Sequence, residues 1–137
     1  MKKHFPNLFA LLILIVPISS CNIDDDDIEL QTTVKIKVID GVDNSSVTNM
    51  TVYAIGTQEW NLMGAGASTV AKGQVVTDSN GEAFFIVSDL PGSFIGNSNQ
   101  TTFYFLVLYS RGPDNFSAHL GLTFQEGDQK IEILTLD

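Results

Sequence analysis

The sequence has little of the chemistry on which catalysis, metal binding and nucleic-acid binding depend. It contains one cysteine, two histidines and seven lysine or arginine residues against 16 acidic ones, for a net charge of −9. The single cysteine, Cys21, cannot form a disulfide within the chain, so the fold must be held by its apolar core. Because Cys–His pairs and metal-ligand spacings are missing, we predict no enzyme, no metal site and no cofactor. Without clustered lysine and arginine, we also expect no nucleic-acid partner.

A long apolar run is missing as well. The run near the start, Leu8 to Val16, has nine residues, whereas a helix that crosses a bilayer needs about 20. It follows the basic pair Lys2-Lys3 and precedes the small residues Ser19-Ser20. A basic start, a short apolar centre and small residues at the cut site are typical of a secretory signal. We therefore predict that residues 1–20 are a signal peptide.

The four residues Ile18-Ser19-Ser20-Cys21 at the predicted cleavage point resemble the lipobox of bacterial lipoproteins. The resemblance implies that the sulfur of Cys21 is diacylated and that the new amino terminus is acylated as well. Because several acyl chains hold a protein stably on a bilayer, the expected location is the outer membrane, with the lipid anchor as the membrane contact. The alternatives are an ordinary thiol behind a cleaved signal and an uncleaved membrane anchor.

Four consecutive acids, Asp24, Asp25, Asp26 and Asp27, follow the cysteine. Adjacent like charges repel one another and stay hydrated, so residues 21–30 are predicted to form a lipidated, solvated tether. The acidic run beside a lipidated cysteine also resembles the export tag of surface lipoproteins in one Gram-negative lineage. That resemblance implies a protein that faces the cell exterior, and the plain tether remains the alternative.

Residues 31–137 are long enough for one domain and too short for two. Their apolar residues recur with a period of two, and the breaks fall at Gly, Asn, Asp and Pro. We predict an all-β, two-sheet, immunoglobulin-like or transthyretin-like sandwich, with no helix longer than one turn. Its seven strands are expected over residues 33–40, 50–55, 74–77, 82–88, 102–110, 116–124 and 130–136.

Side-chain patterns within these strands predict which faces are buried. Val34, Ile36 and Val38 should point inward, with Lys35 and Lys37 outward. Residues 102–110 are apolar at nearly every position, as expected for a central strand covered on both faces. Residues 116–124 alternate again, and the inward side chains should be Phe116, Ala118, Leu120, Leu122 and Phe124.

The segment Asp78-Ser79-Asn80-Gly81 predicts a turn in which Gly81 has a positive φ and closes a hairpin. Asp78, Asn80 and Glu82 fall at alternate positions, as in an oxygen-rich calcium loop, which is the alternative reading of the turn. The remaining ligands of such a loop are missing, so the structural turn is favoured.

The order of elements resembles the transthyretin-like or carboxypeptidase-regulatory-like β-sandwich family over residues 34 to about 92. The similarity rests on a first strand ending at Asp40-Gly41, a second strand from Val47 to Tyr53, the Asp-Ser-Asn-Gly turn feeding Phe84-Phe85, and the bend at Pro91-Gly92. These motifs are turn chemistry, so they specify fold better than role. The resemblance implies an accessory or adhesive module without an active site.

Loops supply the candidate binding residues. The connection at 56–73 is 18 residues long and holds Trp60, the only tryptophan, and connections of this length tend to be functional or disordered. Trp60 either packs back onto the sandwich or, with Tyr53, offers an aromatic face to a ligand. A second polar loop adds Asn97 and Asn99 to the candidate ligand-binding set.

Two functions from different classes are compatible with these features. The first is a non-catalytic binding or adhesive accessory module on the outer membrane, with a glycan or a protein as its ligand. The second is a structural subunit or spacer of a larger envelope complex, whose partner covers an edge strand or the apolar strand at 103–109. A large exposed apolar patch would favour the second, and a concave aromatic rim around Trp60 the first.

Overall fold

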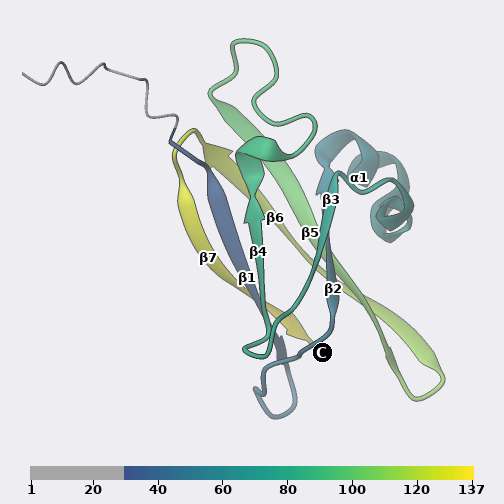
Figure 1. Ribbon diagram of the computed structural model, residues 1–137. Coiled ribbons are helices and arrows are strands. Elements are labelled where there is room, and N and C mark those ends of the chain that lie inside the picture. The colour runs from purple at the N-terminus through teal and green to yellow at the C-terminus, as the bar shows by residue number, and fades with distance from the viewer. Residues whose placement is uncertain (1–29) are drawn as a thin grey trace, which may run out of the picture.

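The computed structural model describes residues 30–137 (Figure 1). The expected signal peptide, Cys21 and the acidic run at 24–27 lie outside the described residues. The described chain forms seven strands, one α-helix and two 3₁₀ helices. They are β1 (Thr33–Asp40), β2 (Thr51–Gly56), α1 (Thr57–Met63), η1 (Gly64–Val70), β3 (Gly73–Val76), β4 (Glu82–Ile86), η2 (Val87–Asp89), β5 (Gln100–Arg111), β6 (Asp114–Gln125) and β7 (Gln129–Leu136).

The strands form two sheets that pack face to face. One has the order β4-β1-β7 and the other β3-β2-β5-β6. β1 and β7 are parallel, and every other neighbouring pair is antiparallel. The prediction of an all-β sandwich with seven strands in two sheets is therefore confirmed.

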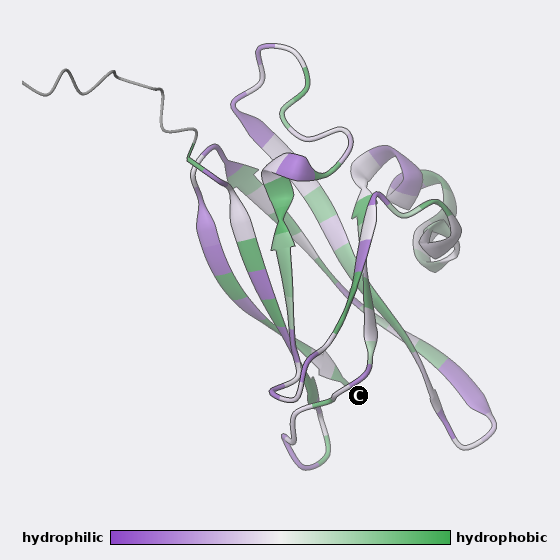
Figure 2. Cartoon of the chain, in the orientation of Figure 1, coloured by the Kyte–Doolittle hydropathy of each residue, from purple (hydrophilic) through white to green (hydrophobic). Residues whose placement is uncertain are grey.

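The core lies between the two sheets and follows the predicted alternation. Val34, Ile36 and Val38 on β1 are fully buried, and hydrophobic and hydrophilic residues alternate along this strand in Figure 2. From the other sheet, the ring of Phe105 meets that of Phe85 edge-on at 5.2 Å. Such an aromatic pair adds about 0.5–1.5 kcal/mol beyond the burial of its area.

The expectation of a long open connection at 56–73, with no helix longer than a turn, is wrong. α1 spans seven residues and η1 another seven, and together they cover the outer face of the four-stranded sheet (Figure 1). Ala67 of η1 is fully buried there with Ile55 and Leu106. The expectation that the central strand β5 is covered on both faces is therefore only partly correct, because Leu106 is buried under this cover whereas Leu108 on the same face is 41% exposed. α1 itself has no buried residue, so it is too short and too exposed to produce a helical stripe in the sequence.

The inward set expected for β6 is only partly correct. Phe124 is fully buried, but Phe116 at the other end of the strand is 44% exposed. The reason is length: β5 and β6 have 12 residues each, whereas the strands of the opposite sheet have five to eight. The tip of the β5–β6 hairpin therefore extends past the core (Figure 1). Phe116 instead stacks on Tyr109, with the ring centroids 5.7 Å apart.

The turn at 78–81 forms as predicted, but it does not close a hairpin. Gly81 has φ +72°, and Asp78 Oδ1 accepts hydrogen bonds from the backbone N–H groups of Asn80 and Glu82 at 2.8 and 3.0 Å. These two bonds stabilise the carboxylate and lower the pKa of Asp78 below its ordinary value. β3 and β4 belong to different sheets, so the turn carries the chain across the sandwich. Residues 30–137 contain no cluster of three acidic, histidine or cysteine side chains that could hold a metal ion.

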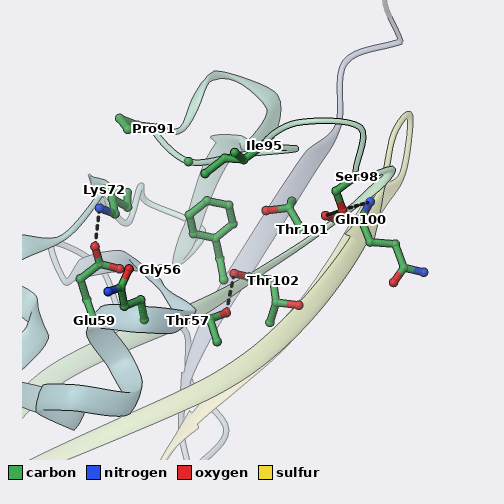
Figure 3. Close-up of a pocket in the computed structure, with 13 residues that line it drawn as sticks. Gly56, Thr57, Glu59, Lys72, Pro91, Ile95, Ser98, Gln100, Thr101 and Thr102 are labelled. Carbon is green, nitrogen blue, oxygen red and sulfur yellow. Dashed lines mark hydrogen bonds and ion pairs between the residues drawn. The ribbon is translucent and has the colours of Figure 1, made fainter.

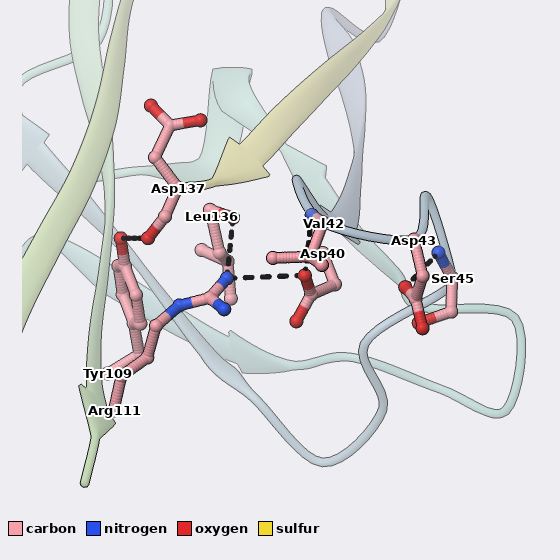
Figure 4. Close-up of polar contacts among 8 residues, drawn as sticks. All are labelled: Asp40, Val42, Asp43, Ser45, Tyr109, Arg111, Leu136 and Asp137. Atoms are coloured by element: carbon pink, nitrogen blue, oxygen red, sulfur yellow. Dashed lines mark hydrogen bonds and ion pairs between the residues drawn. The ribbon is translucent and has the colours of Figure 1, made fainter.

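A polar cluster fixes the end of the sandwich opposite the first residue of β1 (Figure 4). Arg111 Nη2 donates to Asp40 Oδ1 at 3.2 Å and to the carbonyl of Leu136 at 2.9 Å. The hydroxyl of Tyr109 donates to the carbonyl of Asp137 at 2.8 Å. The long hairpin is thereby attached to the last residues of both β1 and β7.

Within the described part of the chain, no helix is long and apolar enough to cross a bilayer.

Candidate functional site

A pocket of about 420 Å³ opens at the end of the sandwich where β2 finishes and β5 begins (Figure 3). Three stretches of chain surround it: residues 56–59 at the junction of β2 and α1, residues 91–98 after η2, and the first residues of β5. Lys72 completes the lining from the segment before β3. The pocket therefore lies where both loops singled out in the sequence meet.

Neutral polar side chains dominate one side of the pocket. Thr57 Oγ1 donates to the carbonyl of Thr102 at 3.1 Å, which ties the start of α1 to β5. Ser98 Oγ donates to the carbonyl of Gln100 at 2.8 Å and orders the loop before β5. Three other lining residues have a side-chain hydroxyl or amide that makes no hydrogen bond within residues 30–137: Gln58, Gln100 and Thr101.

The two charged residues of the lining neutralise each other. Lys72 Nζ forms an ion pair with Glu59 Oε1, and the two side chains are only 29% and 25% exposed. The hydrogen bond from Lys72 lowers the pKa of Glu59 below its ordinary value. The pocket therefore contains one cation and one anion in contact, and no net charge.

Glycine provides the room for this ion pair. A Cβ at Gly56 would lie 2.5 Å from a carboxylate oxygen of Glu59 and 3.3 Å from Cε of Lys72. Gly73, next to Lys72, is equally confined, since a Cβ there would lie 2.7 Å from Cδ2 of Leu90. A larger residue at Gly56 would therefore displace the Glu59 and Lys72 side chains that line the pocket.

Apolar groups form the remaining wall. Phe103 is buried beneath the pocket with 2% exposure, whereas Ile95 is 74% exposed. Figure 3 shows Ile95 and Pro91 across the pocket from Thr57 and Thr102. The loop that carries Ile95 is held by Phe94, which packs against the core. An exposed isoleucine on an anchored loop supplies an apolar contact surface opposite the polar side.

The sequence-predicted aromatic residues lie elsewhere. Trp60 is half-buried and stacks on Tyr104, with centroids 4.9 Å apart and planes 9° apart, and it contacts the ring of His119 at 4.4 Å. Tyr53 packs against the same small cluster on the outer face of the four-stranded sheet. Of the two interpretations of Trp60, the structure therefore shows the one in which it packs back onto the sandwich. Neither Trp60 nor Tyr53 lines the pocket.

Asn97 and Asn99 are exposed and flank Ser98, but they do not line the pocket themselves. The neighbouring residues Ser98 and Gln100 provide the lining from this loop. Pro91-Gly92 was recognised only as a bend that ends a strand. Sequence reasoning missed Thr57 and Thr101, because isolated threonines carry no local signal of a site.

A second surface lies on the outer face of the β4-β1-β7 sheet. Phe84, Ile131 and Ile133 are 53%, 74% and 59% exposed. The strand register places Lys35 between Phe84 and Ile131, and Lys37 beside Ile133. Lys35 pairs with Glu82 at 3.4 Å. We call this row of three apolar side chains on β4 and β7 the apolar row.

No protein-family model matches the chain, and no curated protein matches it. Among solved structures, the chain is similar to the crystal structure of (S)-allantoin synthase, with 13% sequence identity and a TM-score of 0.44. The similarity covers 78% of this chain and 41% of that one, so the chain spans less than half of that protein's length. At this level of similarity, the relationship carries no argument about activity.

Proposed function

We propose that this protein is a non-catalytic binding module, anchored on the outer membrane through Cys21, that takes an uncharged saccharide in the pocket at the β2–β5 end. One observation carries the proposal: a pocket of about 420 Å³ is lined on one side by neutral hydroxyl and amide groups and on the other by apolar groups, with no net charge. Ligand pockets in proteins have volumes of about 300–1,000 Å³.

The chemistry of the lining fits a sugar ring. A sugar presents hydroxyl groups that donate and accept hydrogen bonds, together with apolar C–H faces. Gln58 and Thr101 offer donors and acceptors toward such hydroxyls, and Ile95 offers an apolar surface to the C–H face. A charged ligand is disfavoured, because it would have to break the Glu59–Lys72 pair or be buried without a partner.

A non-catalytic role is supported by the state of the two ionisable groups in the pocket. The pKa of Glu59 is lowered further from the neutral range by Lys72, so Glu59 is a poor proton donor at neutral pH, and Lys72 is occupied by the same contact. General acid–base catalysis needs groups whose pKa lies near the working pH. The lining residues contain no cysteine or histidine.

Binding measurements on single variants test the pocket. Gln58→Ala and Thr101→Val should each weaken binding of the best ligand in a panel of neutral saccharides by roughly three- to tenfold, since one hydrogen bond contributes about 0.5–1.5 kcal/mol. Asn97→Ala is the matched control, because Asn97 is a polar, exposed residue of the same end that does not line the pocket. Calorimetry on the whole mature protein gives the affinities. Equal affinities for all three variants and the parent would place the binding outside this pocket.

The anchor is tested separately. Cys21→Ala removes the acyl acceptor, so labelled palmitate should no longer be incorporated and the protein should leave the membrane fraction. Continued labelling or membrane association of the variant would contradict the lipoprotein interpretation.

A structural subunit of an envelope complex is the second candidate, and the apolar row favours it. Ile131 and Ile133 are exposed on the same face of β7, and Phe84 is exposed across Lys35 from them; exposed apolar side chains gathered on one face are typical of protein contacts. β7 is also an edge strand. The strand at 103–109 lies within β5 between β2 and β6, and its outer face is covered at Leu106 but open at Leu108, which is 41% exposed. Ile131→Asp should then dissociate a detergent-extracted complex on a native gel, whereas Thr135→Asp on the same face should not.

A further inference from the structure

The described chain enters the sandwich at the pocket end. The carbonyl of Thr32, just before β1, accepts hydrogen bonds from the backbone N–H groups of Val87 and Ser88 at 2.7 and 3.3 Å. Both belong to η2, and the N–H of Leu90 bonds back to the carbonyl of Val87 at 3.1 Å. Pro91, the next residue, lines the pocket. A continuous set of backbone bonds therefore connects the point where the chain enters with the wall of the pocket.

The turn between β6 and β7 holds the same point from the other side. Thr33 N–H donates to the carbonyl of Asp128 at 2.8 Å, and Thr32 Oγ1 accepts from Gly127 N–H at 2.9 Å. Leu30 packs on this turn closely enough that a Cβ at Gly127 would lie 3.1 Å from it. The direction in which the chain reaches the domain is thus fixed by hydrogen bonds and packing on two sides.

The opposite end of the sandwich lies a full strand length away. β1 has eight residues, so its first and last residues are roughly 23 Å apart at about 3.3 Å per residue. Its last residue, Asp40, pairs with Leu136 at the end of β7, and the last residue, Asp137, lies there as well (Figure 1). The two ends of the described chain therefore project from opposite ends of the domain, and the pocket shares its end with Leu30.

We propose that the pocket binds the saccharide headgroup of a lipid in the same membrane that holds the protein. This inference rests on the proposed function, both for the lipid anchor and for the saccharide. Leu30 is the ninth residue after Cys21, and nine extended residues reach at most roughly 30 Å. The anchor thus keeps the pocket end within that distance of the bilayer. Tethering at this range converts binding into an intramolecular event with a high effective concentration of headgroups.

Moving the anchor to the other end of the domain tests the orientation. The mature chain, residues 21–137, contains one cysteine, so the unacylated Cys21 thiol can be coupled to a maleimide lipid. The matched variant carries Cys21→Ser and an added cysteine after Asp137. Both are attached to phosphatidylcholine vesicles containing monogalactosyl or monoglucosyl diacylglycerol. A photoreactive benzophenone residue in place of Asn97, which lies at the pocket end without lining the pocket, reports headgroups there by crosslinking.

We expect the protein anchored through Cys21 to crosslink glycolipid at least about tenfold more than the protein anchored beyond Asp137. Soluble methyl galactoside or methyl glucoside should compete with this crosslinking, because the pocket recognises the sugar. If the soluble sugars bind but both anchor positions crosslink equally, the membrane orientation is wrong while the proposed function stands. If neither the soluble sugars nor the glycolipids bind, both are wrong. Crosslinking that soluble sugar does not reduce would reflect contact with the bilayer and overturn the inference.

Discussion

Gly81 is the residue at which the geometry makes the sharpest quantitative prediction. It has φ +72°, and a Cβ added there would lie 2.9 Å from the carbonyl oxygen of Val38 and 3.1 Å from the backbone nitrogen of Val47. These atoms cannot rotate away, because Val38 also accepts a hydrogen bond from Val47 N–H at 2.9 Å and donates one to the carbonyl of Gly81 at 2.8 Å. Gly81→Ala should therefore introduce both backbone strain and a steric clash.

Gly96 separates these two contributions. Its φ is +70°, nearly the same as that of Gly81, but an added Cβ would meet no atom within 4 Å. The left-handed conformation costs an alanine about 1–2 kcal/mol, and overpacking against a fixed neighbour adds about 1–3 kcal/mol. We therefore expect Gly96→Ala to lose about 1–2 kcal/mol and Gly81→Ala about 2–5 kcal/mol. For a domain near 100 residues, 1 kcal/mol lowers Tm by roughly 4–8 °C.

Thermal unfolding of the mature protein, followed by circular dichroism, measures both variants. Gly81→Ala should lower Tm by roughly 10 °C or more, and Gly96→Ala by about half of that or less. The parent protein should unfold at the same temperature with and without a chelator, since the turn needs no calcium in this interpretation. Equal losses for the two variants would refute the steric argument, and a chelator-sensitive Tm would restore the calcium loop.

Three further predictions address the outer face, the pH dependence and the acidic run. Gly121→Ala should shift the fluorescence of Trp60, because the new Cβ would lie 2.8 Å from the Tyr104 ring on which Trp60 stacks. Since the folded-state pKa of Asp78 is lowered, its stabilising contribution is present above the ordinary carboxyl pKa near 4 and is lost as the pH falls through the folded value. Asp78→Asn should therefore weaken the loss of Tm on acidification. Alanine at 24–27 should preserve lipidation but reduce digestion by protease added to whole cells, and unchanged digestion would reduce the run to a tether.

The strands could be predicted because each one carries its own evidence. On β1, Val34, Ile36 and Val38 alternate with Lys35 and Lys37, and only a half-buried strand buries the first set while leaving the second at the surface. The turn before Glu82 was equally local, since Asp78 and Gly81 satisfy the backbone bonds and the φ that it requires. Fold class followed from these separate local signals.

Sheet membership could not be predicted in the same way. Asp-Ser-Asn-Gly specifies a change of direction, and this change serves a hairpin and a crossing between sheets equally well. Which one forms depends on pairing far along the chain: β4 pairs with β1, whereas β3 pairs with β2. The helical segment was missed for a related reason, because Ala67 becomes buried when η1 packs against Ile55 of β2 and Leu106 of β5.

The pocket was even harder to predict from the sequence, because its residues are far apart along the chain. Thr57 and Thr102 are 45 residues apart in sequence and are joined by one hydrogen bond. Neither belongs to a motif, and the charges that could have drawn attention, Glu59 and Lys72, are also separated by a whole helical segment. Trp60 was considered a binding residue because it is the only tryptophan. In the structure its large apolar ring instead covers the sheet by stacking on Tyr104. Unremarkable polar residues become a site only when the fold brings them together.

The pocket and the apolar row lie on different parts of the domain. The pocket lies at the end of the sandwich, whereas the apolar row lies on the outer face of the β4-β1-β7 sheet, with Ile131 and Ile133 on the edge strand. No residue is shared between them, and the sheet that carries the row contributes none of the pocket lining. A partner on the sheet face would leave the pocket open. We therefore propose that binding and assembly are separable properties, and that loss of one through substitution in its own surface should leave the other intact.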